Sequence, residues 1–226
     1  MAELLPETVE AEFARDRYFP AQLAVLGALL LYIALPDKLT LAPDWLVPGL
    51  EGLLLLVLVV NTPWGRRGRF SEAQLRNRRR ATFAVTLLAA VANVTSLAFL
   101  FDFVIHEGQI AGYRLVLSGV EIWATNVLIF AVAYWELDGG GPESRRRRYS
   151  GRQADFLFTQ TGRKDFEGWR PTFLDYLYTS FTNCTAFSPT DTMPLTTRVK
   201  MLMLVQGLTA LTTIGVVVAR AVSLLD

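Results

Sequence analysis

The sequence has little charge, one cysteine and one histidine. Only 19% of its 226 residues are charged, whereas a soluble domain usually carries about a quarter. Cys184 alone excludes an intramolecular disulfide framework, and His106 alone excludes bis-His haem ligation and multi-histidine zinc sites within one chain. The sequence has no HExxH, GxSxG or Walker motif. We therefore expect no enzyme active site, cofactor or metal, and the net charge of +1 predicts no nucleic-acid partner.

Long hydrophobic runs dominate the sequence, in which 52% of residues are hydrophobic. A helix that crosses a bilayer needs roughly 20 predominantly apolar residues, because about 30 Å is covered at about 1.5 Å per residue. Five segments meet this requirement, namely residues 18–35, 45–61, 81–105, 115–137 and 200–225. A sixth segment, residues 172–187, is short and polar for a membrane span.

Arginine is concentrated in two of the connecting segments. Residues 62–80 contain seven arginines, and residues 138–171 contain seven more together with Lys164. The alternate connectors hold only Lys38, and then Arg114 with His106. The positive-inside rule therefore predicts that both arginine-rich segments are cytoplasmic. We expect contacts with anionic lipid headgroups from Arg66, Arg67, Arg145, Arg146, Arg147 and Arg148.

These observations predict an all-α integral membrane bundle of six transmembrane helices, with both termini in the cytoplasm. Five helices plus one short or half helix at residues 172–187 is the alternative. The predicted organisation begins with a cytoplasmic amphipathic segment at residues 1–17 and four transmembrane helices within residues 18–137. A basic cytoplasmic loop at residues 138–171 follows, and residues 172–226 form a helix pair joined by an outer turn with the sequence SPTD.

Polar residues recur at helical spacing within the apolar segments. They could line a pore or polar interior, or they could form hydrogen bonds between packed helices. Carboxylates contribute little to such packing, so Glu121 and Asp175 favour a functional interior, with Asp175 at its inner vestibule. The complete set of candidates is Glu121, Asn126, Asp175, Thr179, Thr182, Asn183, Thr185, Ser188, Asp191 and Gln206.

Three motifs carry a resemblance to a known family: DGGG at residues 138–141, DYLYTSFTNCTAFSPTD at residues 175–191, and the arginine at position 198. Together they resemble a family of bacterial multi-pass membrane proteins that is catalogued as a domain of unknown function. The resemblance implies a multi-pass membrane fold in the bacterial plasma (inner) membrane and no established activity.

The segment after residue 185 also resembles the pore loop of potassium channels. Asp191, Pro194, Thr196 and Arg198 follow a Thr-Ala-Phe step much as similar residues follow the channel filter. That filter needs glycines whose carbonyl groups turn toward the pore axis. This sequence instead has Ser188, Pro189 and Thr190 there, which argues against a potassium-selective filter and leaves a less selective mouth open.

Two functions follow from these patterns. The first is a small-ion permeation protein, channel-like or transporter-like, whose pore could form within one chain or between subunits of a homo-oligomer. The alternative is a non-conducting membrane scaffold or regulator whose basic loops dock lipid or a partner. Aromatic residues beside charges at residues 155–158 and 166–169 favour a loop that lies against the membrane.

Overall fold

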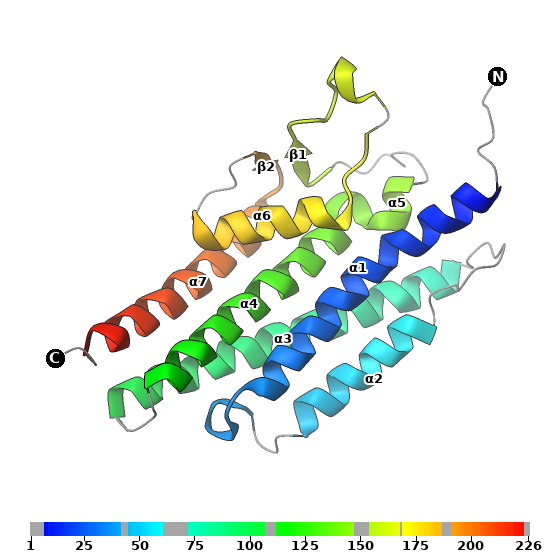
Figure 1. Cartoon of the computed structure of the whole chain (residues 1–226). Helices are drawn as coiled ribbons and strands as arrows, with labels where there is room; N and C mark the ends of the chain where they lie inside the picture. Colours follow the sequence, from blue (N-terminus) through cyan, green and yellow to red (C-terminus); the bar gives the residue numbers. More distant parts are fainter. Residues whose placement is uncertain are drawn as a thin grey trace.

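The computed structural model describes residues 7–41, 45–60, 72–106, 112–146, 154–167, 169–186 and 191–223 (Figure 1). This part of the chain is mostly helical, as the sequence predicted. The helices are α1 Glu7–Ala34, α2 Leu46–Val60, α3 Glu72–His106, α4 Gly112–Leu137, α5 Pro142–Arg146, α6 Phe173–Thr185 and α7 Thr197–Ser223. Two short strands, β1 Phe156–Phe158 and β2 Thr192–Pro194, pair in an antiparallel sheet that the sequence analysis did not predict.

Three helices are long and apolar enough to cross a membrane. Their apolar stretches are Arg76–His106, Tyr113–Gly140 and Thr197–Arg220, which agree with the third, fourth and last predicted spans. The first predicted span forms the shorter apolar stretch Tyr18–Ala34 of α1. That helix starts at Glu7, so it continues without a break from the predicted N-terminal segment. The second predicted span forms α2, with 15 residues.

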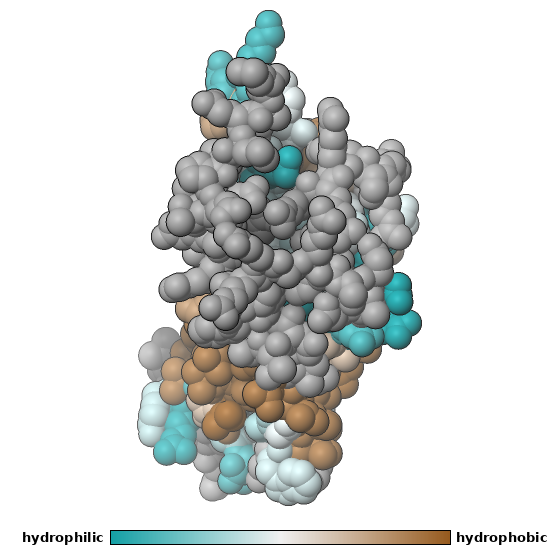
Figure 2. Space-filling view, turned by 90° about the vertical axis from the view of Figure 1, so that its right-hand side faces the viewer, coloured by the Kyte–Doolittle hydropathy of each residue, from teal (hydrophilic) through white to brown (hydrophobic). Residues whose placement is uncertain are grey.

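The polarity of α7 is that of a membrane protein rather than a soluble one. Its exposed side chains are large and apolar, for example Leu204, Leu208 and Leu211, whereas its buried side chains include Gln206 and Thr213. Figure 2 shows hydrophobic residues gathered in a band, with hydrophilic residues above and below it. Lipid can solvate such an apolar outer surface, while polar groups find partners inside the bundle.

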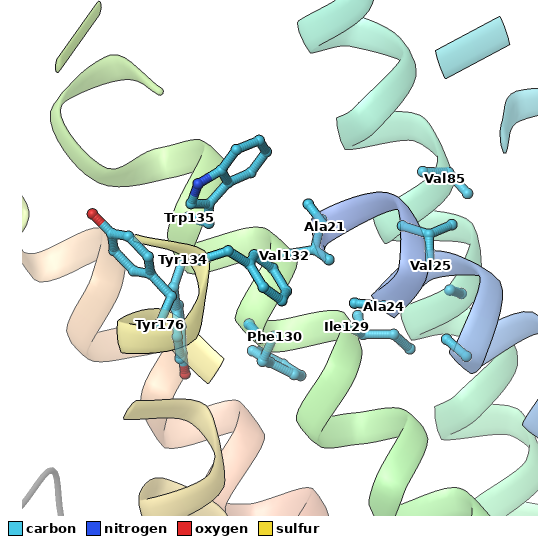
Figure 3. Close-up of a cluster of buried hydrophobic side chains, with 14 of the residues drawn as sticks. Ala21, Ala24, Val25, Val85, Ile129, Phe130, Val132, Tyr134, Trp135 and Tyr176 are labelled. Atoms are coloured by element: carbon cyan, nitrogen blue, oxygen red, sulfur yellow. The ribbon is translucent and has the colours of Figure 1, made fainter. Parts of the chain in front are cut away.

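Helix α4 is the centre of the bundle and packs against α1, α3, α6 and α7. In the most apolar part of α4, 61% is buried inside the bundle, whereas the corresponding share for α7 is 28%. Small residues of α1, Ala21 and Ala24, face Ile129 and Val132 of α4 in the core (Figure 3). Small side chains let two helix backbones approach closely, which is a common way to pack helices in lipid.

Contacts along α4 fix the direction of its neighbours. Tyr18, in the first half of α1, packs edge-on against Trp135 near the end of α4, with ring centroids 5.7 Å apart. The guanidinium of Arg78, early in α3, lies 3.3 Å from the centre of the Tyr18 ring. The N-terminal halves of α1 and α3 therefore lie beside the end of α4. We call this end of the bundle, which also carries β1, β2 and the first turn of α7, the basic end.

The structure does not show the predicted sixth crossing. Helix α6 reaches the middle of α4, where Phe181 packs against Trp123 (Figure 1). Most of the SPTD turn lies outside the described residues. After it, β2 pairs with β1, with Phe156 opposite Pro194 and Phe158 opposite Thr192, so both strands lie at the basic end. This arrangement is compatible with the alternative of five helices plus one short or half helix.

The C-terminal helix starts at the same end of the bundle as α1. The first turn of α7 lies at the basic end, where Arg198 bonds to Asp155. Farther along, Val217 lies against Gly119 near the start of α4. Helices α1 and α7 therefore run in the same direction, and the last residue described, Ser223, lies at the end of the bundle opposite to the start of α1.

We predict that Gly119→Ala separates α4 from α7. A Cβ atom at Gly119 would overlap with Cγ2 of Val217, and a β-branched valine in a helix has one strongly preferred rotamer. Overpacking of this kind costs about 1–3 kcal/mol, which thermal unfolding in detergent would measure.

Two controls accompany this variant. A Cβ at Gly215 of α7 would meet nothing within 4 Å, so Gly215→Ala should leave the melting temperature unchanged or higher. Val217→Ala in the Gly119→Ala background should restore stability. If Gly119→Ala alone is as stable as the unaltered protein, the close contact between α4 and α7 is wrong.

Candidate functional site

The interior polar residues meet at Gln206 of α7, whose side chain is completely buried. Its Oε1 atom accepts hydrogen bonds from the hydroxyl of Tyr134 at 2.5 Å and from Nδ2 of Asn183 at 2.8 Å. Its Nε2 atom donates to Oγ of Ser180 at 2.6 Å and to Sγ of Cys184 at 3.0 Å. One amide thus joins α4, α6 and α7.

The groups around Gln206 are themselves paired. Asn126 donates to the backbone carbonyl of Gln206 at 3.2 Å, and Asn183 donates to that of Met203 at 3.0 Å. Ser180 donates to the carbonyl of Val127 at 2.7 Å. Each of these side chains donates a hydrogen bond to another helix, as is typical of buried polar groups in a stable protein.

The structure therefore joins three of the predicted interior residues, Asn126, Asn183 and Gln206. Thr179 is buried beside them and bonds to Thr192 of β2 at 3.2 Å. Cys184, which the sequence analysis did not single out as a site residue, belongs to the same cluster.

The other predicted interior residues that the structure describes do not join this cluster. Thr182 and Thr185 donate to carbonyls of their own helix. Asp191 is exposed and accepts a bond from Tyr178 at 3.3 Å. Glu121 is buried on α4. Ser188 lies outside the described residues.

Asp175 has a structural role at the start of α6. Its Oδ2 atom accepts hydrogen bonds from the backbone N–H of Thr172 at 2.6 Å and from the Thr172 hydroxyl at 2.8 Å. This is a capping box: Thr172 is the N-cap residue, and the side chain of Asp175, the third residue of the helix, accepts a hydrogen bond from its backbone N–H. The inner-vestibule role that the sequence suggested for Asp175 stays a prediction.

Asp138 and the glycines after it form the corner at the end of α4. Gly139, Gly140 and Gly141 have φ values of 56°, 87° and 98°, a region in which a side chain is strained. The buried Asp138 carboxylate accepts bonds from the backbone N–H of Asp155 at 2.7 Å and from the hydroxyl of Tyr176 at 2.6 Å. The DGGG motif thus fixes β1 and α6 against α4.

A second carboxylate, that of Asp155, joins this corner to α7. Its oxygens accept two bonds from the Arg198 guanidinium, at 2.7 and 2.5 Å, and one from the Thr196 hydroxyl at 2.6 Å. Burial by itself would raise the pKa of Asp155, but the hydrogen bonds from Arg198 and Thr196 and the charge of Arg198 lower it below the ordinary aspartate value. Asp155 is therefore a carboxylate at neutral pH.

Sequence reasoning did not identify Asp155 as a site residue, and it interpreted the aromatic residues after it as part of a loop against the membrane. Phe156 and Phe158 are buried in the core, while Leu157 between them is exposed. This period of two was visible in the sequence and is typical of a strand with one buried face. Trp169 packs on the Phe158 ring, with centroids 5.6 Å apart.

A pocket of about 770 Å³ opens beside this corner at the basic end. Its walls come from the α4–α5 corner and from the segment that follows β1. Four basic side chains and two acidic ones line it together with several aromatic rings. The charged residues are Arg145, Arg163, Lys164, Arg170, Asp138 and Glu167, and the rings belong to Phe156, Phe158, Phe166 and Trp169.

Of the predicted lipid-contacting arginines, the structure describes the side chain of Arg145. Its Nη1 donates to the backbone carbonyls of Trp135 and Asp138, at 2.8 and 2.5 Å, and so satisfies the C-terminal end of α4. Arg146 is the last residue of α5. Arg66, Arg67, Arg147 and Arg148 lie outside the described residues.

Within the described ranges, no group of three or more His, Cys, Asp or Glu side chains is arranged to hold a metal ion. No family model, curated protein or solved structure matches this chain.

We predict that Asp155→Asn lowers stability at neutral pH and removes part of the acid sensitivity. Folding lowers the pKa of Asp155. The ionised carboxylate therefore contributes its full share of folding stability above the pKa of the unfolded chain, about 3.9, and this contribution is lost as the pH falls below that value. Loss of the bonds to Arg198 should cost about 1–3 kcal/mol at pH 7. Melting temperatures in detergent between pH 7 and pH 3 would measure both effects.

Asp165→Asn is the matched control. Asp165 pairs with Arg163 at 3.4 Å on the exposed surface, where such pairs contribute about 0–1 kcal/mol. An equal loss of stability in both variants, or an unchanged acid profile in Asp155→Asn, would contradict the structural role of Asp155.

Proposed function

We propose that this chain is a non-conducting membrane protein, a scaffold or regulator, that binds an anionic ligand at its basic end. The distribution of polar groups carries this proposal. Polar side chains inside the bundle bond to one another around Gln206, whereas basic side chains gather around a pocket of about 770 Å³ at one end. The protein thus gathers basic side chains at one end of the bundle.

The hydrogen bonds around Gln206 favour packing over permeation. A permeation path needs polar groups that can replace the hydration shell of a passing ion. Asn126, Asn183 and Gln206 use their amides to connect α4, α6 and α7. An ion that used these oxygens would first have to break bonds that hold the three helices together.

A five-span topology accompanies this proposal. Helices α1, α3 and α7 would leave the basic end across the bilayer, α2 and α4 would return to it, and α6 would enter and leave on the same side. The positive-inside rule favours the cytoplasm for the basic end, where Arg76, Arg79 and Arg80 accompany the pocket residues. The chain would then start inside and end outside the bacterial plasma membrane.

We predict opposite locations for the two termini. A reporter enzyme active only in the periplasm, fused after Asp226, should be active, and green fluorescent protein fused before Met1 should fluoresce, because both results follow from an odd number of spans. The reciprocal fusions are the controls and should be silent. If the periplasmic reporter fused after Asp226 is silent and green fluorescent protein fused there fluoresces, the six-span topology is correct instead.

Passage of a cation or proton beside Glu121 is the second candidate function. Helix α4 buries this carboxylate within its apolar stretch, and ionisable groups in a membrane often mark an ion path.

Flux measurements on purified protein in liposomes test both candidates. We predict no flux of alkali cations, protons or halides, because the polar interior serves to hold the helices together. Gln206→Leu should lower the melting temperature, since it leaves Tyr134 and Asn183 without their acceptor, at a cost of about 1–3 kcal/mol.

Thr209→Val on the same helix is the control, because its hydroxyl bonds only to the carbonyl of Val205 one turn away. It should change stability little. Measurable flux that Glu121→Gln abolishes while stability is preserved would favour permeation and overturn the proposed function.

A further inference from the structure

We infer that the pocket at the basic end binds an anionic phospholipid of the bilayer, with the phosphate headgroup inside the pocket and the acyl part over an apolar rim. This inference rests on the proposed function and specifies its ligand. Three features carry it: the charge of the pocket, its aromatic floor, and a pair of exposed apolar side chains on the adjacent sheet.

The charge of the pocket selects an anion. Arg163, Lys164 and Arg170 lie on its exposed wall, and Arg145 lies deeper, with its guanidinium 5.1 Å from the centre of the Tyr176 ring. The Asp138 carboxylate at the corner already accepts bonds from two backbone N–H groups and from Tyr176. Glu167 also lines the pocket, and Asp165 pairs with Arg163 at 3.4 Å. The four basic side chains still outnumber these three carboxylates, so the lining keeps an excess of positive charge that attracts an entering phosphate.

The floor of the pocket is apolar and rigid. Phe156 and Phe158 are buried, and the Phe158 ring packs edge-on against Tyr176, with centroids 5.3 Å apart. Trp169 covers the same ring from the segment that carries the basic residues. A pocket of about 770 Å³ lies within the usual range for small-molecule sites, about 300–1,000 Å³. It can hold a glycerophosphate headgroup together with the first part of an acyl chain.

The rim supplies the reason to prefer a lipid over a water-soluble phosphate. Leu157 and Met193 are cross-strand partners in the two-stranded sheet, so their side chains share its outer face. They are 39% and 66% exposed, and Leu195 beside them is 45% exposed. Leu157 and Leu195 also line the pocket. A lipid would cover this apolar face with its acyl chain while its phosphate reached the basic wall.

Native mass spectrometry of the full chain in a neutral detergent tests this inference. Three probes are titrated: phosphatidylglycerol, phosphatidylcholine with the same acyl chains, and glycerol 3-phosphate without acyl chains. We expect phosphatidylglycerol to bind at least about tenfold more tightly than either of the others, because only it presents both a net negative headgroup and an apolar chain.

Two variants locate the site. The double variant Arg163→Glu with Lys164→Glu should weaken phosphatidylglycerol binding by about tenfold or more. The double variant Arg80→Glu with Lys200→Glu is its control, because it makes the same change of charge with exposed residues that do not line the pocket. Leu157→Thr with Met193→Thr should weaken phosphatidylglycerol binding and leave glycerol 3-phosphate binding unchanged.

Each contrary result has its own meaning. Equal binding of the two phospholipids, or equal loss in both charge variants, would overturn a specific site for an anionic lipid. Binding of glycerol 3-phosphate as tight as that of phosphatidylglycerol would overturn the lipid and leave the proposed anionic ligand in place. If none of the anionic probes binds, both the inference and the proposed ligand-binding function fail, whatever the flux measurements give.

Discussion

The carboxylate of Asp138 holds together segments that are far apart in the sequence. It lies where the chain leaves α4, and its two oxygens accept bonds from the backbone of β1 and from Tyr176 of α6. Asp155 then extends the connection to Thr196 and Arg198 at the start of α7. Because these bonds are buried or partly buried, each unpaired partner would be costly. The position of the half helix and the shape of the pocket both depend on this corner.

Sequence reasoning predicted the parts of the fold that depend on local composition. The three longest apolar helices were located because hydropathy over about 20 residues needs no knowledge of neighbours. The polar positions of α6 and α7 were recognised from helical spacing, and Asn183 and Gln206 do meet. The interpretation of those residues as packing groups or as a pore lining was left open, because spacing does not reveal which partner a side chain finds.

The differences concern contacts between distant segments. The six-helix prediction counted residues 172–187 as a full crossing, whereas Phe158 of β1 pairs with Thr192 of β2 at the end from which α6 starts. Asp175 was predicted as a carboxylate of the polar interior, and its bonds to Thr172 give it the role of a helix cap. Asp155 drew no attention, since its partners Gly139 and Arg198 are 16 and 43 residues away in the sequence.

The hydrogen bonds of Gln206 also bear on the order in which the chain is made. Helix α7 leaves the ribosome after α4 and α6, and its buried amide would be costly in lipid without partners. Tyr134, Ser180 and Asn183, which bond to that amide, all precede it in the sequence. During synthesis α4 and α6 can therefore present a finished polar groove to α7. Helix α7 can enter the bilayer by docking onto that groove, so its polar face need never meet lipid.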